Sequence, residues 1–293
     1  MIALDRRVVS ETGIINQDVF GFLKGLDACG HWQASLLTQG LKHHVVSQFA
    51  QMRTRGQRVM SGATGIQASF FSQKIYAIAI EWLDGICFLS FKDKVGATQY
   101  RLRSLAEPGS DDYWQLLDWI TRFESHAPIR FKRFHGCRQS RQLDVIAIRK
   151  AWSELAHPQQ AGTLFKAHQH QLTGLYHALS PEFAGQCDIG FLTQLLDTCR
   201  NERVNLELTA RNACLTQTHT GRIKQCLQDD AHTVIRDKGF KLELSAVEQL
   251  SIWWLRIAQK NQDVYQVKVF NQLDQEVLSI ASARPSPVWN RLF

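Results

Sequence analysis

The chain has 293 residues, of which 44% are hydrophobic and 21% charged, values typical of a globular protein with one large core or two ordinary ones. No apolar run approaches the ~20 residues of a membrane span, and the N-terminus lacks the features of a secretory signal. Seven cysteines without a CxxC pair fit reduced thiols. We therefore expect a cytoplasmic protein without membrane insertion. Its net charge of +7 favours an anionic partner.

The first half combines short helices with a dense run of strands. Apolar spacing and glycines predict a short helix within residues 17–26 and another over His31 to Leu41, where Leu36, Leu37 and Leu41 share a face. Strands are predicted at 45–49, 59–60, 66–71, 75–82, 86–91 and 100–105, with Asp84-Gly85 as a hairpin turn. Residues 111–123 form a predicted helix whose first-turn aspartates complement the helix dipole.

The second half repeats this mixture in a similar order. Helices are predicted at 145–155, 163–179 and 191–199, the last capped by Asp188. Strands are predicted at 204–208, 214–217, 222–227, 241–244, 252–257, 264–270 and 277–280, and 288–293 closes the chain. Helices in small groups beside runs of strands indicate an α+β fold.

Four pairs of residues, taken in order, suggest that the two halves are copies of one plan. Leu36-Leu37 matches Leu195-Leu196 and Met60 matches His219, both at a spacing of 159, while Phe91 matches Phe270 at 179 and Trp114 matches Trp289 at 175. The increase predicts a longer hairpin in the second copy. We expect a first repeat at 1–126, a basic connector at 127–144 and a second repeat at 145–293.

A series of motifs runs through the second half: Trp152-x-x-Leu155, Leu164 and Lys166 with His168, Asp188 with Leu195-Leu196, Gln217-x-His219-Thr-Gly221, Trp253-x-x-Arg256, Val267-x-Val269-Phe270, and Arg284 followed by Trp289-x-x-Leu292. In order and spacing they resemble the cytoplasmic haem-utilisation proteins of Gram-negative bacteria, the HemS/ChuS/PhuS type of hemin-transport or hemin-degrading factor. The first half is similar through Leu36-Leu37, Trp82-x-x-Gly85, Leu89-Ser-Phe91 and Tyr113-Trp114-x-x-Leu117.

The resemblance implies two structural repeats, each an antiparallel sheet with a helical group, and haem held in a cleft between helices and sheet. It implies haem binding and intracellular haem trafficking or utilisation in bacterial iron acquisition, with a haem-uptake transporter or a haem oxygenase as partner. Because the sequence has no flavin or nicotinamide motif, haem degradation would need an external reductant. We therefore favour a carrier over an enzyme.

The resemblance also implies iron ligands, and here the sequence departs from the family. The axial histidine falls on Gln159, a poor ligand, so His157 becomes the substitute. The family's first-repeat arginine falls at or near Tyr76, which is either a phenolate ligand or an ordinary strand aromatic. The first-repeat histidine falls on Met60, either a thioether ligand or a core residue.

Other candidates surround these positions. Arg256 or Arg284 would meet the haem propionates, and His219 would line the fold rather than bind iron. The histidines 168, 170 and 177 form the densest cluster, either solvated or flanking haem. No metal beyond haem iron is expected.

Two other kinds of function, binding of a protein partner and binding of nucleic acid, are alternatives. Loss of both axial positions would fit a paralogue that keeps the fold and acts as a partner-binding or regulatory protein. The basic residues Arg130, Lys132, Arg133, Arg138 and Arg141 could contact nucleic acid. That role is disfavoured, since neither a helix-turn-helix pattern, zinc spacing nor an aromatic stacking motif accompanies them.

Overall fold

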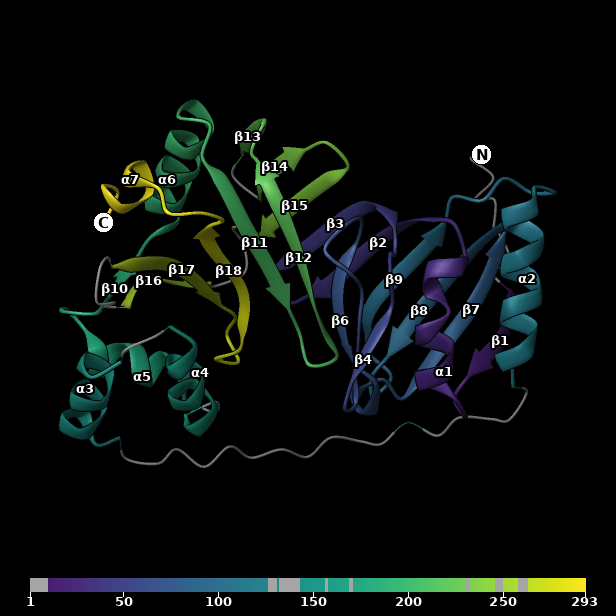
Figure 1. Ribbon diagram of the computed structural model, residues 1–293, viewed down its shortest axis with the longest axis horizontal. Coiled ribbons are helices and arrows are strands. Elements are labelled where there is room, and N and C mark those ends of the chain that lie inside the picture. Colours follow the sequence, from purple (N-terminus) through teal and green to yellow (C-terminus); the bar gives the residue numbers. More distant parts are fainter. Residues whose placement is uncertain are drawn as a thin grey trace, which may run out of the picture. The chain divides into compact units, whose positions relative to one another are not determined.

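The computed structural model describes residues 10–125, 131, 143–155, 158–168, 171–229, 232–245, 250–257 and 263–293. The chain divides into two compact units (Figure 1). The first unit comprises Met1–Leu37, His44–Phe134 and Ala213–Gln217, and the second comprises Thr38–His43, His135–Asn212 and Thr218–Phe293. Each unit thus includes a short segment from the opposite half of the sequence.

The first unit is built on a mainly antiparallel sheet. Its strands lie in the order β1 (Ser10–Ile15), β7 (Ala77–Leu83), β8 (Ile86–Lys92), β9 (Thr98–Ser104), β2 (His31–Thr38) and β3 (Leu41–Gln48). A second antiparallel group contains β4 (Arg53–Arg55), β5 (Arg58–Met60) and β6 (Gln67–Phe71). The amide of Phe71 donates to the carbonyl of Cys214 over 2.8 Å, which ties the borrowed segment to this unit.

Two helices complete the first unit, α1 (Val19–Lys24) and α2 (Asp111–Phe123), with short 3-10 turns at Leu26–Ala28 and Ser72–Lys74. Ser110 caps α2 by accepting from the amide of Tyr113. The rings of Phe22 on α1 and Trp119 on α2 stack at a centroid distance of 3.9 Å. The two helices are therefore joined by aromatic packing.

The second unit repeats the strand order of the first. Its sheet runs β10 (Ala184–Cys187), β16 (Ser251–Ile257), β17 (Val264–Phe270), β18 (Glu276–Ser282), β11 (Asn205–Arg211) and β12 (Leu215–Arg222). The strands β13 (Gln225–Gln228), β14 (His232–Asp237) and β15 (Phe240–Ser245) form a further antiparallel group. Ser245 donates to the carbonyl of Gly40, in the segment that this unit borrows.

Helices cover the sheet of the second unit on both sides (Figure 1). On one side lie α3 (Val145–Ser153), α4 (Pro158–Ala167) and α5 (Leu172–Leu179); on the other lie α6 (Ile189–Asn201) and α7 (Pro287–Asn290). The first three enclose a core with β10, β16 and β17 that includes Trp152, Tyr176, Trp253 and Phe270. The first unit has no counterpart of this three-helix group among its described residues.

The predicted α+β fold with two repeats is confirmed, and the strand registers align the copies. The strands β1, β2, β3 and β7 begin 174 residues before β10, β11, β12 and β16 (184 − 10, 205 − 31, 215 − 41 and 251 − 77). Between β8 and β17 the spacing is 178 (264 − 86), because the β16–β17 connection is longer. The second copy thus has a longer hairpin between β16 and β17, within the interval 219–270 that the residue pairs indicated.

The register also corrects the residue pairs from which the duplication was predicted. Leu36-Leu37 lies on a strand whereas Leu195-Leu196 lies on a helix, and Met60 is on β5 whereas His219 is on β12. The hydrogen-bonded pair Ser35–His44 instead corresponds to Thr209–Thr218. Ser110 and Ser286 occupy matching cap positions, so Trp289 corresponds to Tyr113 and not to Trp114. The bulges of the two sheets also match, so Phe91 corresponds to Val269 and not to Phe270.

Two predicted helices are wrong in type or extent. The segment His31 to Leu41 forms a hairpin of β2 and β3, in which Trp32, Ala34 and Leu36 are buried in alternation and Gly40 takes a φ of 77° at the turn. The predicted helix 163–179 divides into α4 and α5 because Gln171 leaves the helical region, with a φ of −147°.

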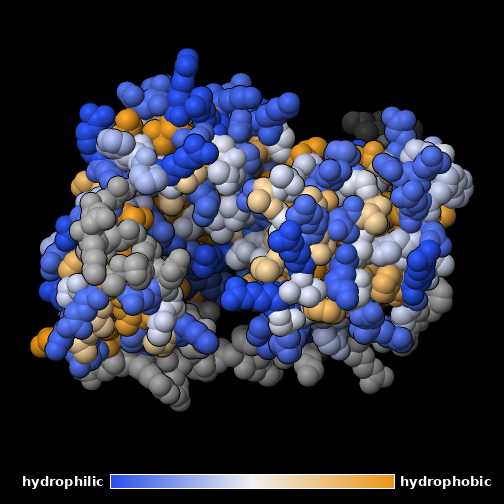
Figure 2. Space-filling view, in the orientation of Figure 1, coloured by the Kyte–Doolittle hydropathy of each residue, from blue (hydrophilic) through white to orange (hydrophobic). Residues whose placement is uncertain are grey.

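No helix in the described parts of the chain is long and apolar enough to cross a membrane. On the face shown in Figure 2, hydrophilic side chains predominate on each unit, and hydrophobic side chains are scattered among the hydrophilic ones.

Candidate functional site

Aromatic side chains fill the space between the second sheet and α3–α5, and we call them the aromatic wall. Trp152 and Phe165 pack edge to face at 5.7 Å, Phe165 stacks on Tyr176 at 6.1 Å, and Tyr176 contacts both Trp253 and Phe270. Residues at alternate positions of a strand share a face, so Trp253 and Leu255 on β16 and Phe270 on β17 all point toward the helices. Trp152, Tyr176, Trp253 and Phe270 are each at most 1% exposed, so this wall is a packed core between the helices and the sheet.

A cluster of charged side chains lies on the same face of the sheet. Lys268 is cross-strand from Trp253 on one side and from Ser279 on the other. Its Nζ donates to Ser279 Oγ at 2.9 Å and to Glu276 Oε1 at 3.2 Å. Arg211 Nε lies 3.4 Å from the same Glu276 oxygen. We call these three charged residues, Lys268, Glu276 and Arg211, the charged triad.

Burial sets the electrostatics of the triad. The side chains of Lys268 and Glu276 are only 7% and 8% exposed, whereas that of Arg211 is 39% exposed. Burial lowers the pKa of Lys268 from its ordinary value, and nearby Glu276 opposes this shift. Burial would raise the pKa of Glu276, but Lys268 and Arg211 together bring it below its ordinary value. Two cations against one carboxylate leave one formal positive charge.

The hydroxyl of Tyr176 connects the aromatic wall with the triad. It is fully buried and has no hydrogen-bond partner among the described residues. Burial raises the pKa of Tyr176 well above its ordinary value, Glu276 adds to the rise and Arg211 opposes it. A buried hydroxyl without a partner is unusual in folded proteins and calls for a physical explanation.

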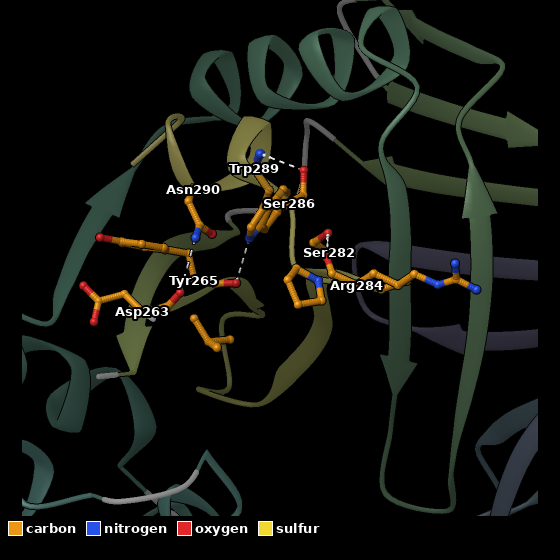
Figure 3. Close-up of a pocket in the computed structure, with 10 residues that line it drawn as sticks. Asp263, Tyr265, Ser282, Arg284, Ser286, Trp289 and Asn290 are labelled. Carbon is orange, nitrogen blue, oxygen red and sulfur yellow. Dashed lines mark hydrogen bonds between the residues drawn. The ribbon is translucent and has the colours of Figure 1, made fainter. Parts of the chain in front are cut away.

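Two arginines predicted to meet propionates, Arg256 and Arg284, lie elsewhere in this unit. Arg256 alternates with Leu255 and Ile257 and therefore points to the opposite face of β16, where its Nη1 lies 3.7 Å from Asp263. Arg284 borders a pocket of about 160 Å³ formed with Tyr265 and Trp289. Its guanidinium points away from both rings (Figure 3). This volume is below the ~300–1,000 Å³ of typical ligand sites.

His219 also faces away from the triad, since its neighbour Thr218 shares the face of Thr209 and the triad. Its ring stacks on Phe240 at 3.9 Å, and its Nε2 lies 3.2 Å from Asp237 Oδ2. A Cβ at Gly221 would lie 2.6 Å from that carboxylate oxygen and 2.8 Å from the histidine Nε2, so only glycine leaves room for the pair. The contacts around His219 are those of a packed side chain.

Tyr76 and Met60 belong to the first unit. Tyr76 immediately precedes β7, is 38% exposed, and its ring lies 5.9 Å from that of Phe131. Met60 is on β5, paired across the strands with Arg53 and Ser69. Their proposed roles as iron ligands stay predictions.

The remaining candidates lie at or beyond the limits of the described residues. His157, His170 and the basic residues of the connector are outside them, and Gln159 is described only as part of the α4 backbone. His168 follows the end of α4, with its amide bonded to the carbonyl of Leu164. His177 lies edge-on to Trp253 at 4.6 Å and borders an open polar pocket of about 430 Å³. Within the described residues, no three His, Cys, Asp or Glu side chains are grouped to hold a metal.

The sequence analysis missed the triad and Tyr176. Lys268 is the only charged residue in the run Val267-Lys-Val-Phe270, and a cation within such an apolar strand is the signal that could have identified it. Glu276 and Arg211 gave no comparable signal, because each begins or ends a strand.

Comparisons with known proteins agree on the fold. Holo-PhuS, a heme-binding protein from Pseudomonas aeruginosa, superposes with a TM-score of 0.84 and 19% identity over 96% of this chain and 85% of that chain. ChuS, the heme degrading enzyme of Escherichia coli O157:H7, superposes with a TM-score of 0.82 and 14% identity over 96% and 85%. A second structure of ChuS, an E. coli heme oxygenase, gives 0.80 and 14% over 96% and 87%.

No protein-family model and no curated protein matches the sequence. At these identities the superpositions establish a shared fold, that of the HemS/ChuS/PhuS type, and the resemblance read from the sequence is confirmed at that level.

Proposed function

We propose that the protein binds haem and carries it within the cell during bacterial iron acquisition. The observation that carries this proposal is the shared fold with holo-PhuS, a heme-binding protein, over 96% of the chain. The chain's own residues support it through the charged triad, in which the side chain of Arg211 is 39% exposed.

The iron ligand is proposed to be His157 or Tyr76. In haem proteins the protein contributes axial ligation, and histidine and tyrosinate both serve this purpose. The candidates differ in chemistry, because a neutral imidazole and an anionic phenolate give different absorption spectra. Arg256 and Arg284 stay predicted propionate partners, although neither lies on the face that carries the triad.

A carrier role is preferred to haem degradation. The sequence contains no nucleotide-binding motif of the glycine-rich types, so any oxidative step would depend on an external reductant. A haem-uptake transporter would supply the haem and a haem oxygenase would receive it. Both partners, and the cytoplasmic location, are part of this proposal.

Titration of the purified protein with hemin tests the proposal. We expect saturable binding with a shifted Soret band, and loss of that shift in His157→Ala or in Tyr76→Phe, whichever residue binds the iron. His232→Ala, at an exposed histidine of β14, is the matched control and should titrate like the wild type. An unchanged hemin spectrum with the wild-type protein would show that haem is not its ligand.

One observation favours a second function. Gln159 stands where the family has its axial histidine, which is expected of a paralogue that keeps the fold but binds a protein partner instead of haem. Expression with haem supplied separates the two functions, since a haem carrier is recovered coloured and such a paralogue colourless.

A further inference from the structure

Arg211 has hydrogen-bonding capacity that the protein does not use. Its Nε lies 3.4 Å from Glu276 Oε1 as an ion pair but makes no hydrogen bond within the described residues. With 39% of its side chain exposed, Arg211 is the member of the triad that a ligand can reach. A guanidinium with two free terminal nitrogens can bind a carboxylate through two parallel hydrogen bonds.

A buried ion pair, Lys268 with Glu276, lies beside Arg211. Glu276 accepts from Lys268, which is itself bonded to Ser279, so the carboxylate that Arg211 approaches is fixed from the other side. Because both residues are buried, these interactions are poorly screened by water. The triad retains one formal positive charge, and an incoming carboxylate would neutralise it.

Two further observations indicate that the triad serves a ligand. The buried Tyr176 hydroxyl lies within electrostatic range of Glu276 and Arg211 and lacks a partner in the described residues. The duplication supplies the other observation, since the fold forms the same strands without the triad. At the positions of Lys268, Glu276 and Arg211 the first copy has Ser90, Thr98 and Leu37.

The first copy does have a charged pair on the equivalent face, Arg101 with Glu81, but it lies at other positions and its arginine is 45% exposed. Among the described residues, a buried lysine and glutamate therefore occur only in the copy that carries α3–α5 and the aromatic wall.

We infer that Arg211 is the carboxylate-binding residue of the haem site, oriented by Glu276 and Lys268. This inference rests on the proposed function. It assigns to Arg211 one carboxylate of the ligand, namely a propionate at the edge of the macrocycle.

The test compares protoporphyrin IX, which has two free carboxylates and no iron, with its dimethyl ester, by quenching of protein fluorescence. We expect the wild type to prefer the free acid and Arg211→Ala to lose about ten- to a hundred-fold in affinity for the acid alone, as for a charge-assisted hydrogen bond. Arg211→Lys, which keeps the charge but not the planar fork, should fall between them.

Two further variants separate positioning from general damage. Glu276→Gln should reduce the acid-over-ester preference, because Arg211 loses its fixed partner. Arg222→Ala removes one exposed charge from β12, outside the triad, and should leave the preference unchanged. Thermal melts recorded by circular dichroism confirm that each variant is folded.

The outcomes distinguish this inference from the proposed function. If Arg211→Ala keeps the wild-type preference while hemin still shifts its Soret band, Arg211 is not the carboxylate residue and haem binding stands. If the preference depends on Arg211 but hemin gives no spectral change, the carboxylate site stands and iron ligation does not. Binding of neither porphyrin by the wild type overturns both.

Discussion

Lys268 and Glu276 are almost completely buried, and burial of ions is costly unless they are paired and hydrogen-bonded. Both conditions are met, because Lys268 donates to Glu276 and Ser279, and Glu276 also faces Arg211. A hydrophobic pair of the same volume could pack here at no greater cost. The presence of charge at these positions thus fits a role in ligand binding better than a role in stability.

His219 predicts a pH dependence of stability. Burial lowers its pKa from 6.5, although Asp237 opposes the shift. The unfolded chain then binds a proton more readily than the folded one. The contribution of His219 is fully present above pH 6.5 and is lost as the pH falls through the lowered folded value. We expect the melting temperature of the wild type to fall between pH 7.5 and 5.5.

The variant His219→Gln removes this titration, so its melting temperature should change less over the same interval. His232→Gln, at a half-exposed histidine in the same unit, serves as the control. Differential scanning fluorimetry at half-unit steps of pH provides the measurement. If the melting temperatures of His219→Gln and the wild type change equally with pH, a group other than His219 causes the loss of stability at acid pH.

The site was only partly predictable from the sequence because its residues come together only when particular strands pair. Lys268 and Arg211 are 57 residues apart, and only the strand order β17–β18–β11 brings them together around Glu276. His219 attracted attention through its polar neighbours, yet alternation turns it to the other face of β12. Type and spacing alone cannot specify which strands become neighbours.

At the scale of elements, Asp188 shows how a single residue fixes a helix start. Its Oδ1 accepts from the amide of Phe191 at 2.7 Å, as predicted for the cap of α6. We expect Asp188→Ala to lower the free energy of unfolding by about 1 kcal/mol. Asp188→Asn keeps an acceptor and should cost less. Chemical denaturation of both variants measures their free energies of unfolding. Equal losses for the two variants would mean that the cap acts through its charge alone.

Elements with local signals were predicted well and those that depend on pairing were not. The helix 111–123 agrees with α2 because Ser110, Asp111 and Asp112 mark its start, and Asp84-Gly85 forms the expected turn with φ values of 51° and 76°. The apolar residues of His31 to Leu41 fit either a helix or a hairpin by spacing. Pairing of β2 with β9 decides for the strand, through backbone hydrogen bonds that no side chain signals.

At the scale of the whole molecule, the order of motifs predicted the fold, whereas the residue pairs chosen to align the two copies were mismatched. Each copy keeps one strand order, and the copies differ mainly in α3–α5. The repeat boundaries at 1–126, 127–144 and 145–293 stay a prediction. Each compact unit also contains a segment from the other half, Thr38–His43 in the second unit and Ala213–Gln217 in the first.

Those exchanged segments lead to a prediction about the halves in isolation. His43 is fully buried and packs edge-on against Phe240 at 5.0 Å, and the thiol of Cys214 lies 3.2 Å from the carbonyl of Lys74. A fragment 135–293 lacks the first contact and a fragment 1–134 lacks the second. We therefore expect neither fragment alone to unfold cooperatively, because each leaves apolar surface of its own unit uncovered.

An equimolar mixture of the two fragments should recover a cooperative melt and elute from a sizing column as one species. The matched control is the full chain with a protease site introduced at residue 135 and cleaved after folding, which should melt close to the uncut protein. Circular dichroism melts of all five samples, namely each fragment, the mixture, the cleaved chain and the uncut chain, make the comparison. If fragment 135–293 alone melts as sharply as the full chain, the second repeat folds independently, and Thr38–His43 contributes little to its core.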